Sequence, residues 1–184
     1  MKQFAIFLIG ILTFASVQAQ GRYFTKSGHI TIYSNAPLED IEAGTRTAAA
    51  ILDVASGTVQ FSVLMKSFEF KKALMQEHFN SDYVESDTYP NGEFKGAIVN
   101  NAAINYNKPG TYTANVKGKL TIHGVTRDVA TTGTVTVAPD GLKTNAIFNV
   151  SLSDYKIKRP ALVKDKLSNT IQITVDCKLD PLKG

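Results

Sequence analysis

The sequence predicts an all-β protein, an eight-stranded antiparallel barrel with one inserted α-helix. Three observations favour this fold. Most of the chain alternates apolar and polar side chains with a period of two, which is typical of strands that bury one face. Short turn sequences separate these runs, and only one segment has helical spacing. About eight strands connected in this way are typical of an antiparallel barrel.

The clearest pair of strands lies between Gly110 and Val137, on either side of His123-Gly124. Two alternating runs around a two-residue break that contains glycine predict a β-hairpin. One face of this hairpin is apolar, and such a face must be buried. Its members are Tyr112, Ala114, Val116, Gly118, Leu120, Ile122, Val125, Val129, Val135 and Val137.

Other segments supply the remaining elements. Alternation predicts strands over residues 29–33, 58–65, 94–99, 142–152 and 169–179, and a strand is modestly favoured over a helix for 39–52. Apolar side chains at three- and four-residue spacing predict the helix over residues 70–79, ended by Asn80-Ser81. Residues 155–168 are basic, contain Arg159-Pro160 and predict a long connection.

The first nineteen residues have the composition of a cleavable signal peptide. Lys2 gives a positive start, an apolar run follows from Phe4 to Phe14, and small residues precede Gln20. The apolar run is short for spanning about 30 Å of hydrocarbon, which argues against the alternative of an uncleaved membrane anchor. We expect cleavage after Ala19, export to the periplasm, and one mature domain over residues 20–184.

Charge and cysteine content exclude further classes. The chain has 20 basic and 16 acidic residues, and loss of Lys2 with the leader leaves a net charge of +3. The basic residues are scattered, which argues against nucleic-acid binding and leaves at most weak attraction to anionic membrane surfaces. Cys177 is the single cysteine, so no disulfide forms within the chain. It falls in the apolar row of the last strand and is predicted to be a buried, unreactive thiol.

The hairpin sequence from Gly118 to Arg127, GKLTIHGVTR, resembles that of the YceI-like family of polyisoprenoid-binding periplasmic proteins. A second block resembles the family too, with His78-Phe79, Asp82-Tyr83, Tyr89-Pro90 and Phe94. The resemblance covers roughly residues 28–179. Where the family usually has an Arg-Asp pair before the His, this chain has Gln76-Glu77.

The resemblance implies a lipocalin-like barrel that binds a polyisoprenoid or quinone-like lipid, with no other cofactor. An eight-stranded barrel is just wide enough to be filled by side chains or to hold one small ligand. The inward rows mix large residues with Ala114, Gly118 and Ala146, which leaves room for an apolar cavity. The residues expected to contact the lipid are Phe61, Val63, Met65, Val116, Gly118, Leu120, Arg127, Phe148, Val150 and Ile173.

Arg127 has two interpretations. It falls in the apolar row near the hairpin turn. Its stem then either packs on the barrel rim with the guanidinium in water, which we favour, or the guanidinium contacts a lipid head group. Both interpretations place it at one end of the barrel.

An enzyme has little support in the sequence. It contains no phosphate-binding glycine loop, no Gly-x-Ser-x-Gly elbow and no His-Glu-x-x-His motif. His29, His78 and His123 lie far apart in the chain, so a three-histidine metal site is not favoured. The main alternative to lipid binding is a structural or stress-related interaction protein with a filled barrel core and no ligand.

Overall fold

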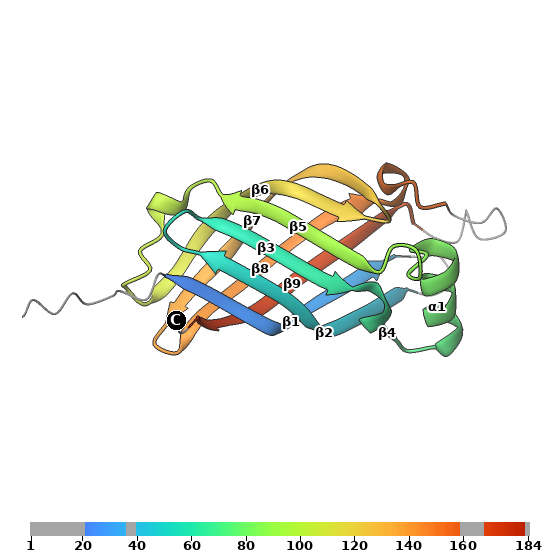
Figure 1. Ribbon diagram of the computed structural model, residues 1–184, viewed down its shortest axis with the longest axis horizontal. Coiled ribbons are helices and arrows are strands. Elements are labelled where there is room, and N and C mark those ends of the chain that lie inside the picture. Colours follow the sequence, from blue (N-terminus) through green and yellow to red (C-terminus); the bar gives the residue numbers. More distant parts are fainter. Residues whose placement is uncertain (1–20, 36–39, 159–167, 183–184) are drawn as a thin grey trace, which may run out of the picture.

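Eight antiparallel strands close into a barrel in the computed structural model, which describes residues 21–35, 40–158 and 168–182 (Figure 1). Neighbours in the barrel follow one another along the chain, and β1 pairs with β2 to close the ring. This confirms the predicted fold class. The barrel strands are β1 (Arg22–Ser34), β2 (Ile41–Asp53), β3 (Thr58–Leu64), β5 (Asn91–Ile98), β6 (Gly110–Ile122), β7 (Val125–Ala138), β8 (Gly141–Ser151) and β9 (Thr170–Pro181).

The segment between β3 and β5 is an insertion that carries the helix. It contains the 3₁₀ turn η1 (Met65–Ser67), the short strand β4 (Glu69–Phe70) on β2, the helix α1 (Ala73–His78) and the π-helical turn η2 (Phe79–Tyr83). The predicted helix is confirmed with different bounds. It begins three residues later than predicted, and a π-helical turn continues from its end through Asn80-Ser81. Two further 3₁₀ turns are η3 (Asn101–Ala103) and η4 (Leu152–Tyr155).

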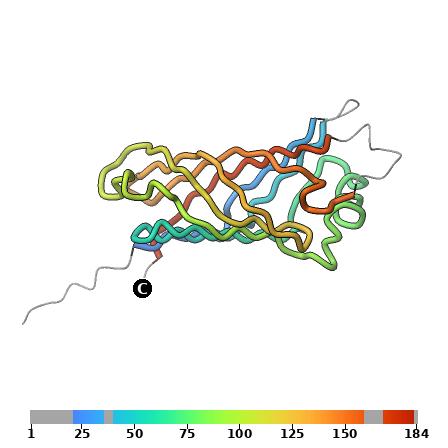
Figure 2. Tube along the Cα trace, turned by 90° about the horizontal axis from the view of Figure 1, so that it is seen from above, coloured from blue at the N-terminus to red at the C-terminus, as the bar shows by residue number. Residues whose placement is uncertain are grey.

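The two ends of the barrel differ. The β2–β3, β5–β6 and β7–β8 connections lie at one end, together with the start of β1 and the end of β9, at the left of Figures 1 and 2. The insertion with α1 lies at the other end, where the β6–β7 hairpin turn and η4 also lie. We call these the turn end and the helix end.

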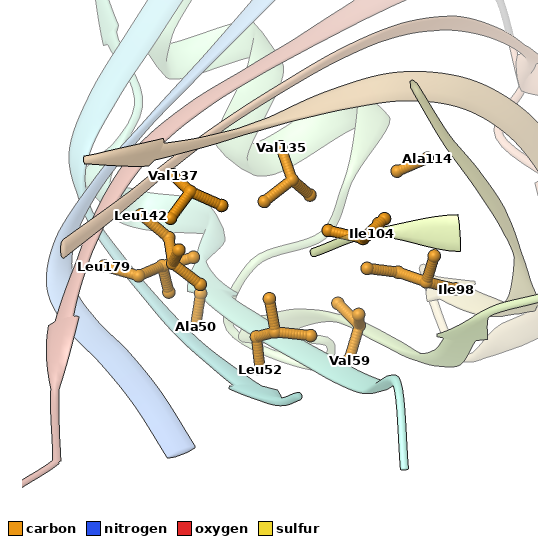
Figure 3. Packing of buried hydrophobic residues seen from close by; sticks show 10 residues of the cluster. All are labelled: Ala50, Leu52, Val59, Ile98, Ile104, Ala114, Val135, Val137, Leu142 and Leu179. Atoms are coloured by element: carbon orange, nitrogen blue, oxygen red, sulfur yellow. The ribbon is translucent and has the colours of Figure 1, made fainter. Parts of the chain in front are cut away.

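A cluster of buried side chains fills the barrel at the turn end (Figure 3). Strands from all sides contribute, and Ile104, which follows η3, points into the middle of the cluster. We call this cluster the plug, because it closes the interior at that end. Its residues are Ala50, Leu52, Val59, Ile98, Ile104, Ala114, Val135, Val137, Leu142 and Leu179.

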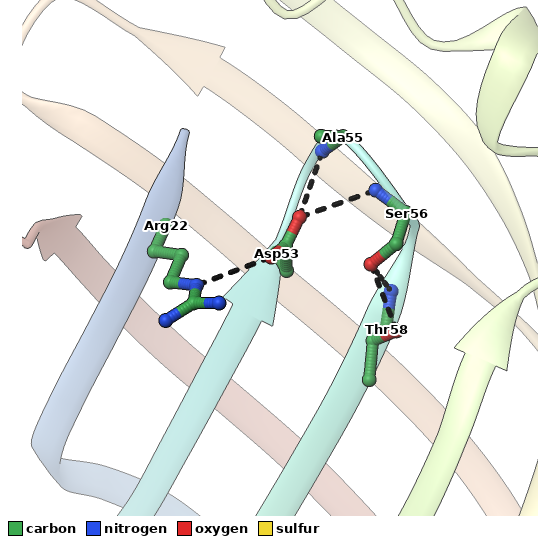
Figure 4. Close-up of polar contacts among 5 residues, drawn as sticks. All are labelled: Arg22, Asp53, Ala55, Ser56 and Thr58. Atoms are coloured by element: carbon green, nitrogen blue, oxygen red, sulfur yellow. Dashed lines mark hydrogen bonds and ion pairs between the residues drawn. The ribbon is translucent and has the colours of Figure 1, made fainter. Parts of the chain in front are cut away.

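The β2–β3 connection is held by one carboxylate (Figure 4). Asp53 accepts hydrogen bonds from the backbone amides of Ala55 and Ser56, at 3.0 and 3.1 Å, and from Arg22 Nε of β1 at 3.1 Å. These donors favour the ionised carboxylate, so the pKa of Asp53 lies below its usual value, with the Ser56 amide as the main cause. The carboxylate of Asp53 thus holds the turn after β2 and ties it to β1.

The predicted hairpin between β6 and β7 is confirmed with a two-residue turn. His123 and Gly124 both have positive φ, 52° and 68°, which matches a type I′ turn. Thirteen residue pairs join the two strands, from Gly110–Val137 to Ile122–Val125. The turn needs a residue without a side chain at its second position, since a Cβ on Gly124 would stand 2.6 Å from the Tyr89 ring.

The pairing of β7 with β8 covers only part of the two strands. Only six residue pairs join β7 to β8, from Ala138–Gly141 to Gly133–Ala146, and the pairing ends there. Between Gly133 and the helix end, side chains of β7 contact β8 and η4 instead. Thr131 Oγ1 donates to the Ile147 carbonyl of β8 at 3.3 Å, and Arg127 Nε donates to the Asp154 carbonyl of η4 at 2.9 Å. We call this unpaired stretch, towards the helix end, the β7–β8 seam.

Other predicted boundaries changed in detail. The strand favoured over a helix for residues 39–52 is confirmed as β2, which begins at Ile41, and the first strand is much longer than predicted because β1 begins at Arg22. The predicted signal peptide and most of the predicted connection after η4, residues 159–167, lie outside the described residues.

Candidate functional site

A cavity of about 340 Å³ lies inside the barrel, between the plug and the insertion at the helix end. Side chains from the inner faces of the barrel strands form its wall, and α1, η2 and η4 contribute residues at the helix end. Its volume falls in the range usual for small-molecule pockets. The side chains of the described residues therefore leave part of the barrel interior unfilled.

Most of the residues predicted to contact a ligand lie on the wall of this cavity. Eight of the ten do so, from four different strands and η1, and the structure thus brings together positions that are far apart in the chain. They are Phe61, Val63, Met65, Val116, Leu120, Phe148, Val150 and Ile173.

Gly118 does not line the cavity, in contrast to the prediction. Its position in the apolar row is as predicted. Gly118 pairs with Gly96 of β5, and the ring of Phe94 covers both, because a Cβ on either glycine would stand 2.6 Å from the Phe94 Cζ. The absence of side chains on the two glycines allows the strands to approach closely and leaves space for the Phe94 ring. Phe94, not Gly118, lines the cavity there.

Arg127 is the second predicted contact residue that lies away from the cavity. It lies exposed at the helix end of β7. Its Nε donates to the Asp154 carbonyl of η4 at 2.9 Å. This matches the favoured interpretation of a rim arginine, with the difference that its guanidinium holds η4 against β7 besides meeting water.

The prediction missed the aromatic side chains of the insertion. Phe68, Phe70 and Phe79 pack together, with ring centroids 5.7 Å apart for Phe68–Phe79 and 5.0 Å for Phe70–Phe79. All three line the cavity at the helix end, as does Tyr83 of η2. The helical spacing of Phe70 and Phe79 indicated a buried face, but nothing in the sequence showed that this face would lie over one end of a barrel.

The two blocks of sequence that carry the resemblance meet at the helix end. The ring of Tyr89 contacts that of His123 edge-on, with centroids 4.5 Å apart. His123 Nδ1 donates to the Tyr155 carbonyl of η4 at 3.1 Å, and its Nε2 lies 3.3 Å from Glu85 Oε1. His123 therefore joins the hairpin, the insertion and η4, which is a structural role.

His78, at the end of α1, lines the cavity and contacts Asp82 one turn later. Its Nδ1 lies 2.6 Å from Asp82 Oδ2. Hydrogen bonds from His78 and Ser81 hold the pKa of Asp82 below its usual value, with His78 as the main cause. In the part of the chain that the structure describes, no three His, Cys, Asp or Glu side chains are grouped in a way that could hold a metal ion.

The cavity wall is almost entirely apolar, and its few polar atoms are informative. Two hydroxyl groups among its lining residues, Ser34 Oγ and Thr144 Oγ1, are buried without a hydrogen-bond partner. Among the described lining residues there is no Lys or Arg, and Glu93 is the only carboxylate. The wall is suited to an uncharged ligand.

Cys177 is buried, as predicted, with 1% of its surface exposed. Its Sγ fills the space beside Gly28, where a Cβ would stand 2.6 Å from the sulfur. Burial raises the pKa of the thiol to about 11. The sulfur thus packs as an apolar atom between β9 and β1.

The fold and the cavity together define a closed antiparallel barrel around an apolar interior. The chain matches the YceI-like domain over residues 8–179 and belongs to that family. This confirms the family resemblance in the sequence. Comparison with curated protein sequences finds no match.

Solved structures share the fold. A polyisoprenoid binding domain from Saccharophagus degradans aligns with a TM-score of 0.77 at 11% identity, covering 89% of this chain and 99% of that one. BcnA of Burkholderia cenocepacia aligns with a TM-score of 0.67 at 19% identity, over 83% and 94% of the two chains. The YceI protein of Campylobacter jejuni gives a TM-score of 0.56 at 15% identity over the whole of both chains.

No helix among the described residues combines the length and the apolar character needed to cross a bilayer.

Proposed function

We propose that this protein binds the chain of an isoprenoid or quinone-like lipid inside its barrel, without catalysis, in the periplasm. The observation that carries the proposal is the apolar cavity between the plug and the insertion. An aliphatic chain gains about 0.8 kcal/mol for each methylene removed from water, before the costs of association are subtracted. Several isoprene units therefore supply a large driving force without any polar contact.

The comparisons support the chemical class of the ligand. The similar domain from Saccharophagus degradans is described as polyisoprenoid binding. The cavity here has the chemistry that such a ligand needs, since its wall comes from aliphatic and aromatic side chains of most barrel strands. The unfilled interior favours a ligand over the alternative of a solid barrel that acts only as an interaction protein.

Periplasmic location rests on the N-terminal sequence, whose short apolar run and small-residue exit are typical of a cleaved leader. The intact mass of the protein recovered from the periplasm tests this point. A mass that begins at Gln20 is expected, and one that retains Met1–Ala19 contradicts export with cleavage.

The experiment that tests binding is extraction of the purified protein with organic solvent, followed by mass spectrometry of the extract. We expect a lipid with a repeating isoprene chain at close to one molecule per protein. A protein that carries none, and that binds no added isoprenoid after delipidation, is instead the ligand-free interaction protein of the alternative.

A further inference from the structure

Ser34 presents a buried hydroxyl without a partner to the cavity. It is the last residue of β1, and its side chain follows Ile30 and Ile32 on the inner face of the strand. Only 2% of its surface is exposed, and its Oγ has no hydrogen-bond partner. A buried hydroxyl loses its bonds to water, so leaving it unpaired is unfavourable and calls for an explanation.

The position of Ser34 is at the helix end of the cavity. It pairs with Ile41 at the start of β2, and the preceding residue, Tyr33, pairs with Gln172 near the start of β9. Thr144 carries the other unpaired hydroxyl of the described cavity wall and lies towards the plug, because it pairs with Val135 of β7 and Cys177 of β9. The two hydroxyls therefore lie towards opposite ends of an apolar cavity.

Charge limits what Ser34 can hold. A phosphate or diphosphate inside the cavity would lose its bonds to water, and the described wall has no Lys or Arg to pair with it. A hydroxyl or carbonyl group carries no such penalty and can make one hydrogen bond to a serine, which both donates and accepts.

We propose that Ser34 binds an uncharged hydroxyl or carbonyl group at the end of the lipid, so that the ligand is an isoprenoid alcohol or quinone with its tail directed towards Thr144 and the plug. This rests on the proposed function of the cavity. The orientation follows from the plug, which fills the turn end. A polar group that reached Thr144 would have to cross the apolar cavity without a partner, whereas one at Ser34 stays at the helix end.

The test compares three probes on the delipidated protein by calorimetry: geranylgeraniol, the hydrocarbon that lacks its hydroxyl, and geranylgeranyl diphosphate. The unmodified protein is expected to bind the alcohol about five- to tenfold more tightly than the hydrocarbon, the worth of one net hydrogen bond. Ser34→Ala should abolish this preference and leave hydrocarbon binding unchanged. Thr144→Val, which removes the other hydroxyl at nearly constant volume, should keep the preference.

Each other outcome overturns the assignment. Ser34 is not the contact if Ser34→Ala keeps the preference for the alcohol, or if Thr144→Val alone removes it. Tighter binding of the diphosphate than of the alcohol contradicts an uncharged ligand. The comparison of alcohol with hydrocarbon needs no variant, so the absence of a preference in the unmodified protein contradicts the proposal even if Ser34→Ala is unstable. Failure of all three probes to bind refutes the proposed function itself, whereas binding without a role for Ser34 refutes only this inference.

Discussion

Gly118 faces Gly96 across the β5–β6 pair so closely that a Cβ on Gly118 would stand 2.5 Å from the Gly96 Cα. The same Cβ would meet the Lys95 carbonyl oxygen at 2.5 Å and the Phe94 ring at 2.6 Å. Two of these neighbours are backbone atoms, which cannot move aside without separating the strands. The glycine pair is thus a packing requirement of the barrel wall.

Gly118→Ala should therefore destabilise the protein by about 1–3 kcal/mol, the usual cost of overpacking a tight site. Chemical denaturation measures the change. Lys117→Ala, one position away on the outer face, is the control and should stay within about 0.5 kcal/mol of the unmodified protein. Equal stability of the two variants would mean that β5 and β6 have room between them.

Val116→Phe should reduce lipid binding, because Val116 lines the cavity and a larger side chain takes up space that the ligand needs. Crowding of this kind costs about 1–3 kcal/mol, which corresponds to a loss of roughly ten- to hundredfold in affinity. Lys117→Phe places the same ring on the exposed face and should bind normally. Quantification of copurified lipid, with a thermal melt to confirm folding, makes the comparison. Full lipid content in a folded Val116→Phe variant would contradict binding in this cavity.

Asp53 should stabilise the protein in a pH-dependent way. Its folded-state pKa lies below the unfolded value of about 3.9, so its contribution is present above that value and is lost as pH falls through the folded pKa. Asp53→Asn keeps one turn-facing oxygen but loses the charge that faces Arg22, and should cost about 1 kcal/mol at neutral pH. The difference should vanish in acid, as measured by urea denaturation at several pH values.

Asp128→Asn is the matched change, since Asp128 forms an exposed ion pair with Lys119 on the outside of the β6–β7 hairpin. Exposed pairs of this kind contribute little. If the two variants behave alike across the pH range, the Asp53 hydrogen bonds do not stabilise the turn.

Cys177 should react slowly with polar thiol reagents. A pKa raised from 9.0 to about 11 lowers the thiolate fraction at neutral pH about a hundredfold, and burial hinders access further. The comparison is Lys178→Cys in a Cys177→Ala background, which moves the thiol to the neighbouring outward position. Labelling followed by mass spectrometry should show the native thiol reacting at least a hundredfold more slowly. Comparable rates would place Cys177 at the surface.

The thiol also bears on stability in alkali. The unfolded chain loses the thiol proton near pH 9 and the folded protein only near 11, so stability should fall as pH rises through this interval.

Backbone amides along the β7–β8 seam should exchange with deuterium faster than those of β9. Half of the amides in residues 125–132 point away from β6, and no backbone pairing to β8 covers that side of the strand. β9, in contrast, pairs with β8 along its length and with β1 over residues 172–176. NMR should show exchange rates at least tenfold higher for the seam amides than for the β9 amides. The seam amides can exchange without separation of two paired strands. Slow exchange along the seam would mean that β7 and β8 pair there in solution.

The sequence predicted the barrel because the interior of a β-barrel repeats every second residue, and that period is visible in the chain itself. Rows such as 112–122 of β6 and 171–179 of β9 face inward as their alternation indicates. The hairpin turn could also be predicted from neighbouring residues alone, since a two-residue turn with positive φ at both positions needs residues such as His123-Gly124.

The amino-acid sequence was enough to predict the fold class, the family, the strands and most of the inward-facing positions, because all of these depend on short-range periodicity and turn chemistry. Tertiary structure alone decided which inward positions meet the cavity. Gly118 became a contact between strands because Gly96 lies opposite it, and the plug depends on Ile104 entering from another segment. The unpaired Ser34 hydroxyl could not be predicted either, since a missing partner is a property of every side chain that surrounds it. Alternation states which face a residue takes, whereas the space beside it depends on strands that lie far away in the chain.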